Sequence, residues 1–90
     1  MNTPVEIRAA VYHIVHEIAL DTAPNDDQAN DDLPTDTYLD SFDTFTLIQD
    51  LEATFNIDVA DEEVSSDNLG SIANIVRFVQ TKRTATAGQV

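Results

Sequence analysis

Ser41 is the side chain best placed for covalent chemistry, because it lies between the carboxylates of Asp40 and Asp43 where the strongest helical pattern of the chain begins. A serine hydrolase would need a base to activate this hydroxyl and an oxyanion site beside it. The chain has no G-x-S-x-G motif, and His13 and His16 are its only imidazoles. The sequence therefore argues against hydrolase chemistry. On physical grounds alone it leaves Ser41 as a helix N-cap.

Two groups of potential metal ligands do not form a convincing site. His13 and His16 are three residues apart, but a zinc site would need further ligands that the chain does not supply in a recognisable pattern. The aspartates of residues 26–36 do not fit a calcium loop, because Asp31 stands where the turn needs glycine and Thr37 where the last ligand should be glutamate. We expect no bound metal.

The stretch 41–55 predicts the helix that positions Ser41, with Ser41 as its N-cap and Asp43 favourably placed for the helix dipole. Apolar residues cluster on one side of this helix at about 100° per residue, which predicts a core-facing stripe. The stripe consists of Leu47, Ile48, Leu51 and Phe55. Phe42 lies almost opposite the stripe and Phe45 lies outside it. Either ring is exposed for docking or covered by the preceding segment, and we favour docking for Phe42.

Two more helices should complete the core. Thr3-Pro4-Val5-Glu6 reads as a capping box, followed by an aliphatic stripe that ends near Leu20. Ser71 can cap a last helix with apolar residues at the i, i+3, i+4 and i+7 positions. The two stripes are Ile7, Val11, Ile14, Val15 and Ile18 in the first helix, and Ile72, Ile75, Val76 and Val79 in the last.

The remaining segments predict one long loop and one short helix. Residues 21–38 lack periodicity and would let the second helix run parallel or oblique to the first, with Leu33, Tyr38 and Leu39 tucked against the core. Residues 60–65 should form one short helical turn with Asp61 as its cap, after Ile57 and Val59 have alternated into the core. We therefore expect an all-α bundle of three main helices plus one short helix, forming one domain over residues 1–83. Residues 84–90 are expected to be a flexible C-terminal tail.

The composition narrows the classes of partner. Seventeen acidic and four basic side chains give a formal charge of −13, which argues against binding to nucleic acid or anionic membranes and favours partners with basic surfaces. The chain has no cysteine, no apolar run of membrane-spanning length and no recognisable signal sequence. We expect a cytoplasmic monomer, and any thiol would have to come from a cofactor.

The motif Asp40-Ser41-Phe42-Asp43-Thr44, followed by Leu47, Leu51-Glu52, Phe55 and Ile57-x-Val59, resembles the modification site and second helix of the acyl and peptidyl carrier proteins. The resemblance continues through Asp61-Glu62-Glu63 to the last helix. It implies an acyl-carrier-like bundle, and it implies that Ser41 carries 4′-phosphopantetheine derived from coenzyme A. The carrier itself would not be a catalyst.

The resemblance also implies the partners. They would be a phosphopantetheinyl transferase, a loading enzyme (an adenylation enzyme, a ligase or an acyltransferase) and downstream synthase or condensation enzymes with basic docking surfaces. Candidate docking residues are Asp40, Phe42, Asp43, Phe45, Asp50 and Glu52. Tyr38 and Leu39 stand where many carriers have glycine, and Phe42 where leucine is common, which favours a free-standing carrier of natural-product biosynthesis. A fatty-acid carrier, a D-alanyl-type carrier and an unmodified acidic helical adaptor stay open.

Overall fold

The computed structural model describes residues 3–19 and 31–87, with side chains up to Arg83. Within these ranges the chain is an all-α bundle of three main helices and one short helix, with a long connection between the first two, so the predicted fold class is confirmed. The elements are α1 (Pro4–Ile18), η2 (Thr35–Thr37), α2 (Ser41–Phe55), η3 (Asp61–Glu63), α3 (Ser66–Leu69) and α4 (Ile72–Ala87), where η denotes a single 3-10 turn. None of the helices in these ranges has the length and apolar character needed to cross a membrane.

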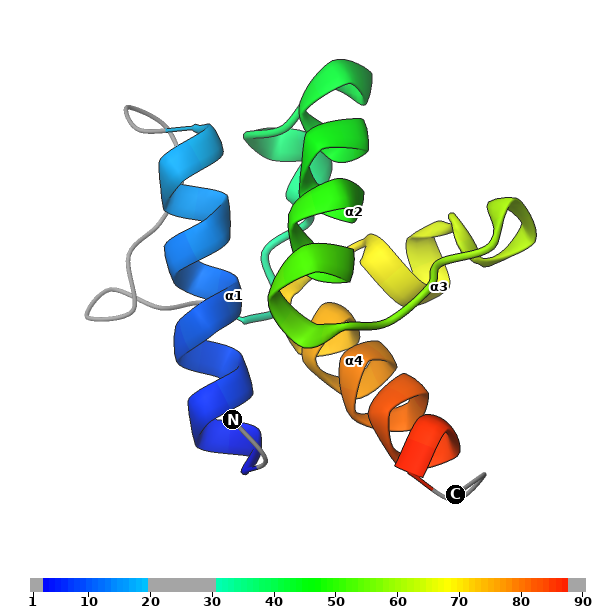
Figure 1. The fold of residues 1–90 in the computed structure, drawn as a ribbon. Coiled ribbons are helices and arrows are strands. Elements are labelled where there is room, and N and C mark those ends of the chain that lie inside the picture. Colours follow the sequence, from blue (N-terminus) through cyan, green and yellow to red (C-terminus); the bar gives the residue numbers. More distant parts are fainter. Residues whose placement is uncertain (1–2, 20–30, 88–90) are drawn as a thin grey trace.

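The helices α1 and α2 lie side by side and run in opposite directions, while α4 packs against both and α3 lies beside the start of α4 (Figure 1). The expectation that α2 would run parallel or oblique to α1 is therefore wrong. The reason lies in residues 31–40. Asp31 contacts Arg8 on the N-terminal half of α1, and the chain then passes back along the bundle before α2 begins.

The predicted start of α1 is confirmed. The hydroxyl of Thr3 accepts the backbone N–H of Glu6 at 3.2 Å, and the Glu6 carboxylate accepts the Thr3 N–H at 3.4 Å, with Pro4 as the first helical residue. These bonds satisfy amides that have no partner inside the helix. The helix ends at Ile18, and Leu20 lies outside the described residues.

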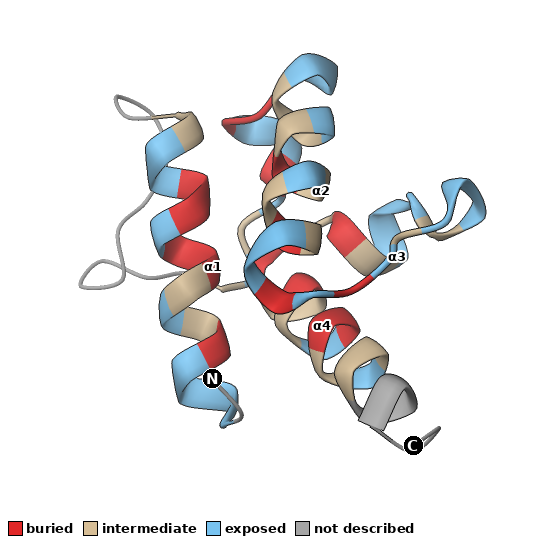
Figure 2. Cartoon of the chain, viewed as in Figure 1, coloured by how far each residue is buried: buried red, intermediate tan, exposed pale blue. Residues whose placement is uncertain are grey.

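The core fills the space between the facing sides of α1, α2 and α4 (Figure 2). The predicted stripes are buried, although Ile18, Ile48 and Val76 are only partly so. Two aromatic residues that the periodicity did not select, Tyr12 and Phe78, are also buried. The buried hydrophobic residues are Ile7, Val11, Tyr12, Ile14, Val15, Tyr38, Leu39, Leu47, Leu51, Phe55, Ile57, Leu69, Ile72, Ile75, Phe78 and Val79.

Residues 31–39 are fixed to the junction between α3 and α4, and this fixes the entry to α2. The N–H of Thr35 donates to the carbonyl of Gly70 at 2.9 Å, and its hydroxyl donates to the carbonyl of Leu69 at 2.8 Å. The N–H of Ala73 donates to the carbonyl of Asp31 at 2.9 Å. A side chain at position 70 would not fit, because a Cβ there would lie 2.3 Å from the carbonyl oxygen of Ser66.

Three expectations about the second half of the chain need correction or completion. The short turn expected at residues 60–65 is present as η3, with Ala60 in the cap position that was predicted for Asp61. The short helix α3 follows outside that range and was not predicted. Ser71 does cap α4, since its hydroxyl accepts the N–H of Asn74 at 3.2 Å. The helix continues to Ala87, past residue 84, where the C-terminal tail was expected to begin, and residues 88–90 lie outside the described part.

Candidate functional site

Ser41 is the first residue of α2, and the N-cap is Asp40 instead of Ser41. The Asp40 carboxylate accepts the N–H of Asp43 at 2.8 Å, and the Asp43 carboxylate accepts the N–H of Asp40 at 3.4 Å. This reciprocal pair is a capping box made of two aspartates. The prediction of Ser41 as N-cap is therefore wrong by one residue, because a carboxylate one position earlier takes the bond that its hydroxyl would have accepted.

The shift leaves the Ser41 hydroxyl without a structural task. Ser41 is exposed, and no described residue donates a hydrogen bond to its hydroxyl or accepts one from it. Both histidines lie on α1 with exposed side chains, and His13 is paired with Glu17 at 3.7 Å. No described imidazole is therefore placed to activate Ser41 as a nucleophile.

The first turn of α2 also supplies a local field. Its leading backbone N–H groups have no carbonyl partners within the helix, so this end carries partial positive charge. That environment favours an anion such as a phosphodiester near Ser41. The carboxylates of Asp40 and Asp43 oppose it, although each is already engaged with a backbone N–H. The site can thus accommodate a phosphate without holding it tightly.

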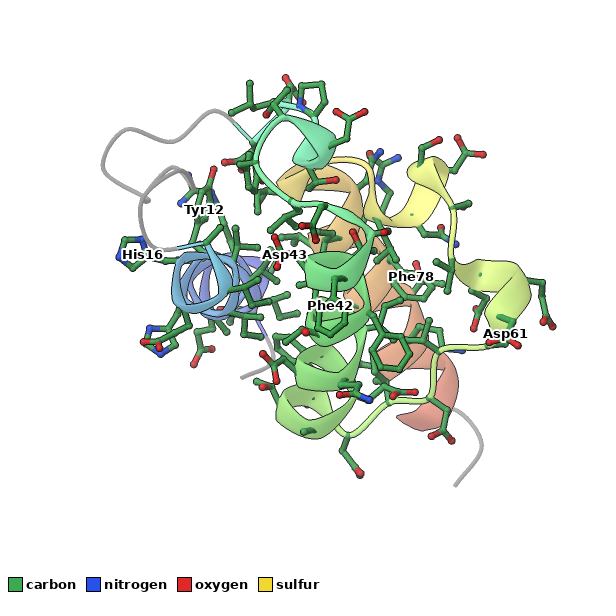
Figure 3. The ribbon with its side chains drawn as sticks, turned by 90° about the horizontal axis from the view of Figure 1, so that it is seen from above. Tyr12, His16, Phe42, Asp43, Asp61 and Phe78 are labelled. Atoms are coloured by element: carbon green, nitrogen blue, oxygen red, sulfur yellow. The ribbon has the colours of Figure 1, made fainter. Side chains whose placement is uncertain are left out.

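Two aromatic rings flank the serine on the outer side of α2. Phe42 is 79% exposed and Phe45 is 61% exposed. In the view from above in Figure 3, Phe42 lies over the near end of α2. The described residues 31–40 do not cover either ring, so the exposure that we favoured for Phe42 is confirmed and Phe45 shares it. Large exposed apolar rings beside acidic residues are typical of partner-docking surfaces.

The six predicted docking residues do not form one cluster. Asp40, Phe42, Asp43 and Phe45 lie within the first turns of α2, whereas Asp50 lies about 12 Å further along the helix from Phe42 at 1.5 Å per residue. Asp40 is exposed, and Asp43 and Asp50 are half-buried.

The carboxylate of Glu52 is already engaged in a hydrogen bond within the chain. It accepts the N–H of Val59 at 2.9 Å and so holds the chain that follows α2. Its predicted role as a docking contact therefore competes with a structural role. A Leu-Glu pair late in a helix does not show this in sequence, because the partner amide lies seven residues away.

A groove of about 340 Å³ lies beside the second turn of α2. It is lined by the turn that precedes α2, by Thr44 of α2, and by residues of the segment 64–70. Its lining residues are Pro34, Thr35, Asp36, Thr44, Val64, Ser65, Ser66, Leu69 and Gly70. Thr44 is three residues after Ser41 and shares its side of the helix, so the groove opens next to the serine.

Sequence reasoning did not find this groove or Val64, which is 43% exposed and lines it. The groove depends on contacts between segments that are far apart in the chain, so no local pattern could reveal it. Within residues 3–19 and 31–87, no group of three or more histidine or acidic side chains is arranged to hold a metal ion.

Comparisons with protein-family models, with curated proteins and with solved structures found no match. The functional proposal therefore depends on Ser41, its surroundings and the sequence motif that contains it.

Proposed function

We propose that the chain is a free-standing carrier protein that holds an acyl or aminoacyl intermediate on a 4′-phosphopantetheine arm attached to Ser41. The observation that carries the proposal is the exposed Ser41 hydroxyl, which takes no part in the cap of α2 and has no described base beside it. A free hydroxyl at a helix N-terminus suits esterification by an external enzyme. When bound, the group supplies a thiol, which the chain lacks, to carry the substrate as a thioester.

The residues around Ser41 fit this group. The hydroxyl is accessible, the first-turn amides favour a phosphate, and the groove beside Thr44 offers room next to the attachment point. Asp40 and Asp43 act as caps, so neither is poised as a general acid or base. The chain's own part is to present the hydroxyl and to be recognised. Loading and transfer chemistry belongs to other enzymes.

Recognition falls to the surface around the serine. Phe42 and Phe45 provide apolar area, and Asp40 and Asp43 provide negative charge next to it. A partner of matching chemistry presents an apolar pocket ringed by arginine and lysine. The proposed partners are a phosphopantetheinyl transferase, a loading enzyme and downstream synthase or condensation enzymes. A formal charge of −13 speeds association with such basic surfaces.

The preferred pathway is natural-product biosynthesis, of the polyketide or nonribosomal peptide kind, and this choice depends on the motif residues alone. A fatty-acid carrier and a D-alanyl-type carrier would differ from a natural-product carrier in the group that they carry. Offering the modified protein to adenylating and acyl-transferring enzymes from its own source, and weighing the product intact, would separate these cargoes.

A second candidate function is an acidic helical adaptor that is never modified. The exposed rings of Phe42 and Phe45 favour it, because they would serve docking without any group on Ser41. Ser41 itself decides between the two functions.

The test is to incubate the purified protein with coenzyme A and a broad-specificity phosphopantetheinyl transferase, and to record its intact mass. We expect a gain of one phosphopantetheine per chain, lost in Ser41→Ala. Ser65→Ala is the matched control, because Ser65 is also exposed at a helix start and makes no capping hydrogen bond. The absence of any gain, with a transferase shown to modify another carrier, would refute the proposal.

A further inference from the structure

The segment between α2 and α3 has almost no anchor in the core. Ile57 and Leu69 are each 5% exposed, but no side chain between residues 58 and 67 is buried. Val59 and Glu63 are half-buried, and the other residues of this segment are exposed. We call residues 58–67 the strap. Detaching it would uncover little apolar area, and regions of this kind have the lowest local stability in a folded domain.

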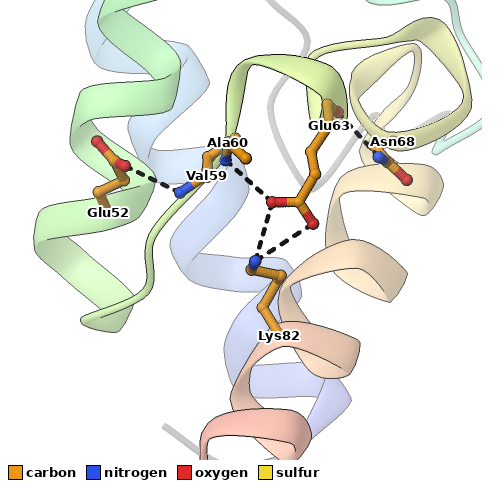
Figure 4. Close-up of polar contacts among 6 residues, drawn as sticks. All are labelled: Glu52, Val59, Ala60, Glu63, Asn68 and Lys82. Atoms are coloured by element: carbon orange, nitrogen blue, oxygen red, sulfur yellow. Dashed lines mark hydrogen bonds and ion pairs between the residues drawn. The ribbon is translucent and has the colours of Figure 1, made fainter.

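Polar bonds hold the strap instead (Figure 4). Glu52 of α2 accepts the N–H of Val59 at 2.9 Å. Glu63 is the centre of the remaining bonds: its carboxylate accepts the N–H of Ala60 at 2.9 Å, and its carbonyl accepts the Asn68 side-chain amide at 2.8 Å. The ammonium group of Lys82 on α4 donates to both carboxylate oxygens of Glu63, at 2.9 and 3.2 Å.

The bond between Glu63 and Lys82 is the one that ties the middle of the strap to α4. The two side chains are 28% and 26% exposed, so water and salt screen the pair less than an ion pair at the open surface. The Lys82 ammonium also lies 6.0 Å from the centre of the Phe78 ring, which restricts its position. A second contact, from the Asn74 side chain to the Ser66 carbonyl at 3.2 Å, lies near the end of the strap.

Charge within the strap favours its release. Its ten residues include five acids and no base: Asp58, Asp61, Glu62, Glu63 and Asp67. Like charges this close repel one another, and the acidic side chains of α2 add to the repulsion. Lys82 supplies the opposing charge. Loss of this one cation should therefore loosen the strap more than loss of an equal charge elsewhere on α4.

The two ends of the strap are fixed points. Ile57 is buried at one end, and at the other Leu69 is buried next to Gly70, whose carbonyl is bonded to Thr35. Val64, Ser65 and Ser66 of the strap line the groove beside Ser41 together with Thr35 and Thr44, which lie outside the strap. Movement of the strap between its fixed ends would thus change the width of the groove.

We propose that the strap opens as a unit while the three main helices stay folded, and that the Glu63–Lys82 pair is the latch that sets how often it opens. Each opening widens the groove beside Ser41. The opening itself is a property of the folded chain, and only its use at Ser41 rests on the proposed carrier function.

Hydrogen exchange of the unmodified protein, followed by NMR, tests the proposal. Amides of Ala60 and Val64 should exchange faster than those of Ile75 and Val79 in α4. In Lys82→Met, which keeps the aliphatic stem, exchange at Ala60 and Val64 should rise about two- to fivefold, with Ile75 and Val79 unchanged. Glu63→Gln should give the same pattern.

Arg77→Met is the charge control, because it removes the same charge from the exposed side of α4. Arg77 is hydrogen-bonded to Asn74, whose side chain contacts Ser66, so any effect of this variant should be confined to that end of the strap. Exchange at Ala60 and Val64 should stay unchanged. Equal exchange rates in the strap and α4 would overturn the proposal. So would no effect of Lys82→Met, or an equal effect on strap and α4. None of these readouts needs a modified Ser41, so failure here is distinct from failure of the carrier proposal.

A cysteine reporter measures the groove directly, since the chain has no cysteine of its own. In Thr44→Cys the thiol would line the groove from α2, outside the strap, and its rate of alkylation should rise by the same factor when Lys82→Met is added. An unchanged rate in the folded double variant would overturn the link between strap and groove.

Discussion

The two buried tyrosines differ in one respect that a single pair of variants can test. The Tyr12 hydroxyl donates to the carboxylate of Asp31, which also forms a bidentate pair with Arg8 at 2.8 and 3.1 Å. The Tyr38 hydroxyl is buried and has no hydrogen-bond partner among the described residues. Replacing each tyrosine with phenylalanine deletes the same atom from two opposite situations.

The expected magnitudes follow from this difference. A hydrogen bond to a charged group contributes about 1.5–3 kcal/mol, and Asp31 keeps Arg8 in the variant, so Tyr12→Phe should cost about 1.5 kcal/mol. Tyr38→Phe removes a polar group that pays a desolvation penalty without a bond. It should leave the free energy of unfolding unchanged or raise it by up to about 1 kcal/mol. In a domain of this size a gap of about 1.5 kcal/mol corresponds to about 6–12 °C in Tm.

Thermal and urea unfolding, followed by far-ultraviolet circular dichroism, would measure the gap, with an unchanged urea m-value as the sign that the two folds are comparable. A double-mutant cycle of Tyr12→Phe with Asp31→Asn isolates their coupling. Equal losses in Tyr12→Phe and Tyr38→Phe would refute the reasoning, because they would mean that both hydroxyls have partners. A Tyr12→Phe protein as stable as the parent would refute it as well.

Four other outcomes follow from the burial and charge of individual side chains. Leu51→Ala should lower the free energy of unfolding by about 2–5 kcal/mol, because Leu51 is fully buried. Phe42→Ala should change it by less than about 0.5 kcal/mol. Equal Tm values for these two variants would mean that the buried and exposed faces of α2 are misassigned. Phe42→Ala should instead raise the KM of the phosphopantetheinyl transferase for this chain about tenfold or more. An unchanged KM would mean that Phe42 does not anchor the transferase. Hydrogen bonds from Arg8 are the main cause that lowers the pKa of Asp31. The pKa of Glu63 is lowered by the Ala60 N–H and then by Lys82. Both carboxylates therefore stabilise the fold at neutral pH, and this stabilisation is lost as the pH falls below about 4. Asp31→Asn and Glu63→Gln should reduce this loss of stability at low pH. A dependence of the free energy of unfolding on pH identical to that of the parent would contradict the prediction. At the alkaline end, burial raises the pKa of Tyr38 to about 12, so folding favours its neutral form and the associated stability is lost as the pH rises above 10.

Local patterns predicted the parts of the fold that local chemistry decides. The capping box at Thr3 and Glu6 depends on residues three apart, and the buried stripe of α2 depends on spacing alone, so both could be read from the sequence. The cap of α2 was displaced by one residue. Asp40 and Ser41 are both good capping residues, and the backbone path out of residues 31–39 decides which one is used.

What could not be predicted depends on contacts between distant residues. The bond from Glu52 to Val59, the pair of Glu63 with Lys82, and the attachment of Thr35 to Gly70 set the groove and the direction of α2. None of them leaves a periodic signal. The exposure of Phe42 could be anticipated from its angle on the helix, but the groove that Val64 shares with Thr44 could not.

The central claim is that Ser41 is the attachment point, and the most direct measurement is the mass of the peptide that contains it. The chain would be co-expressed with a phosphopantetheinyl transferase, cleaved at aspartates, and sequenced by tandem mass spectrometry. We predict one phosphopantetheine on Ser41 in the parent and in Ser65→Ala, with none on any peptide of Ser41→Ala. An unmodified Ser41 peptide beside an active transferase, or a group carried on another residue, would contradict the account.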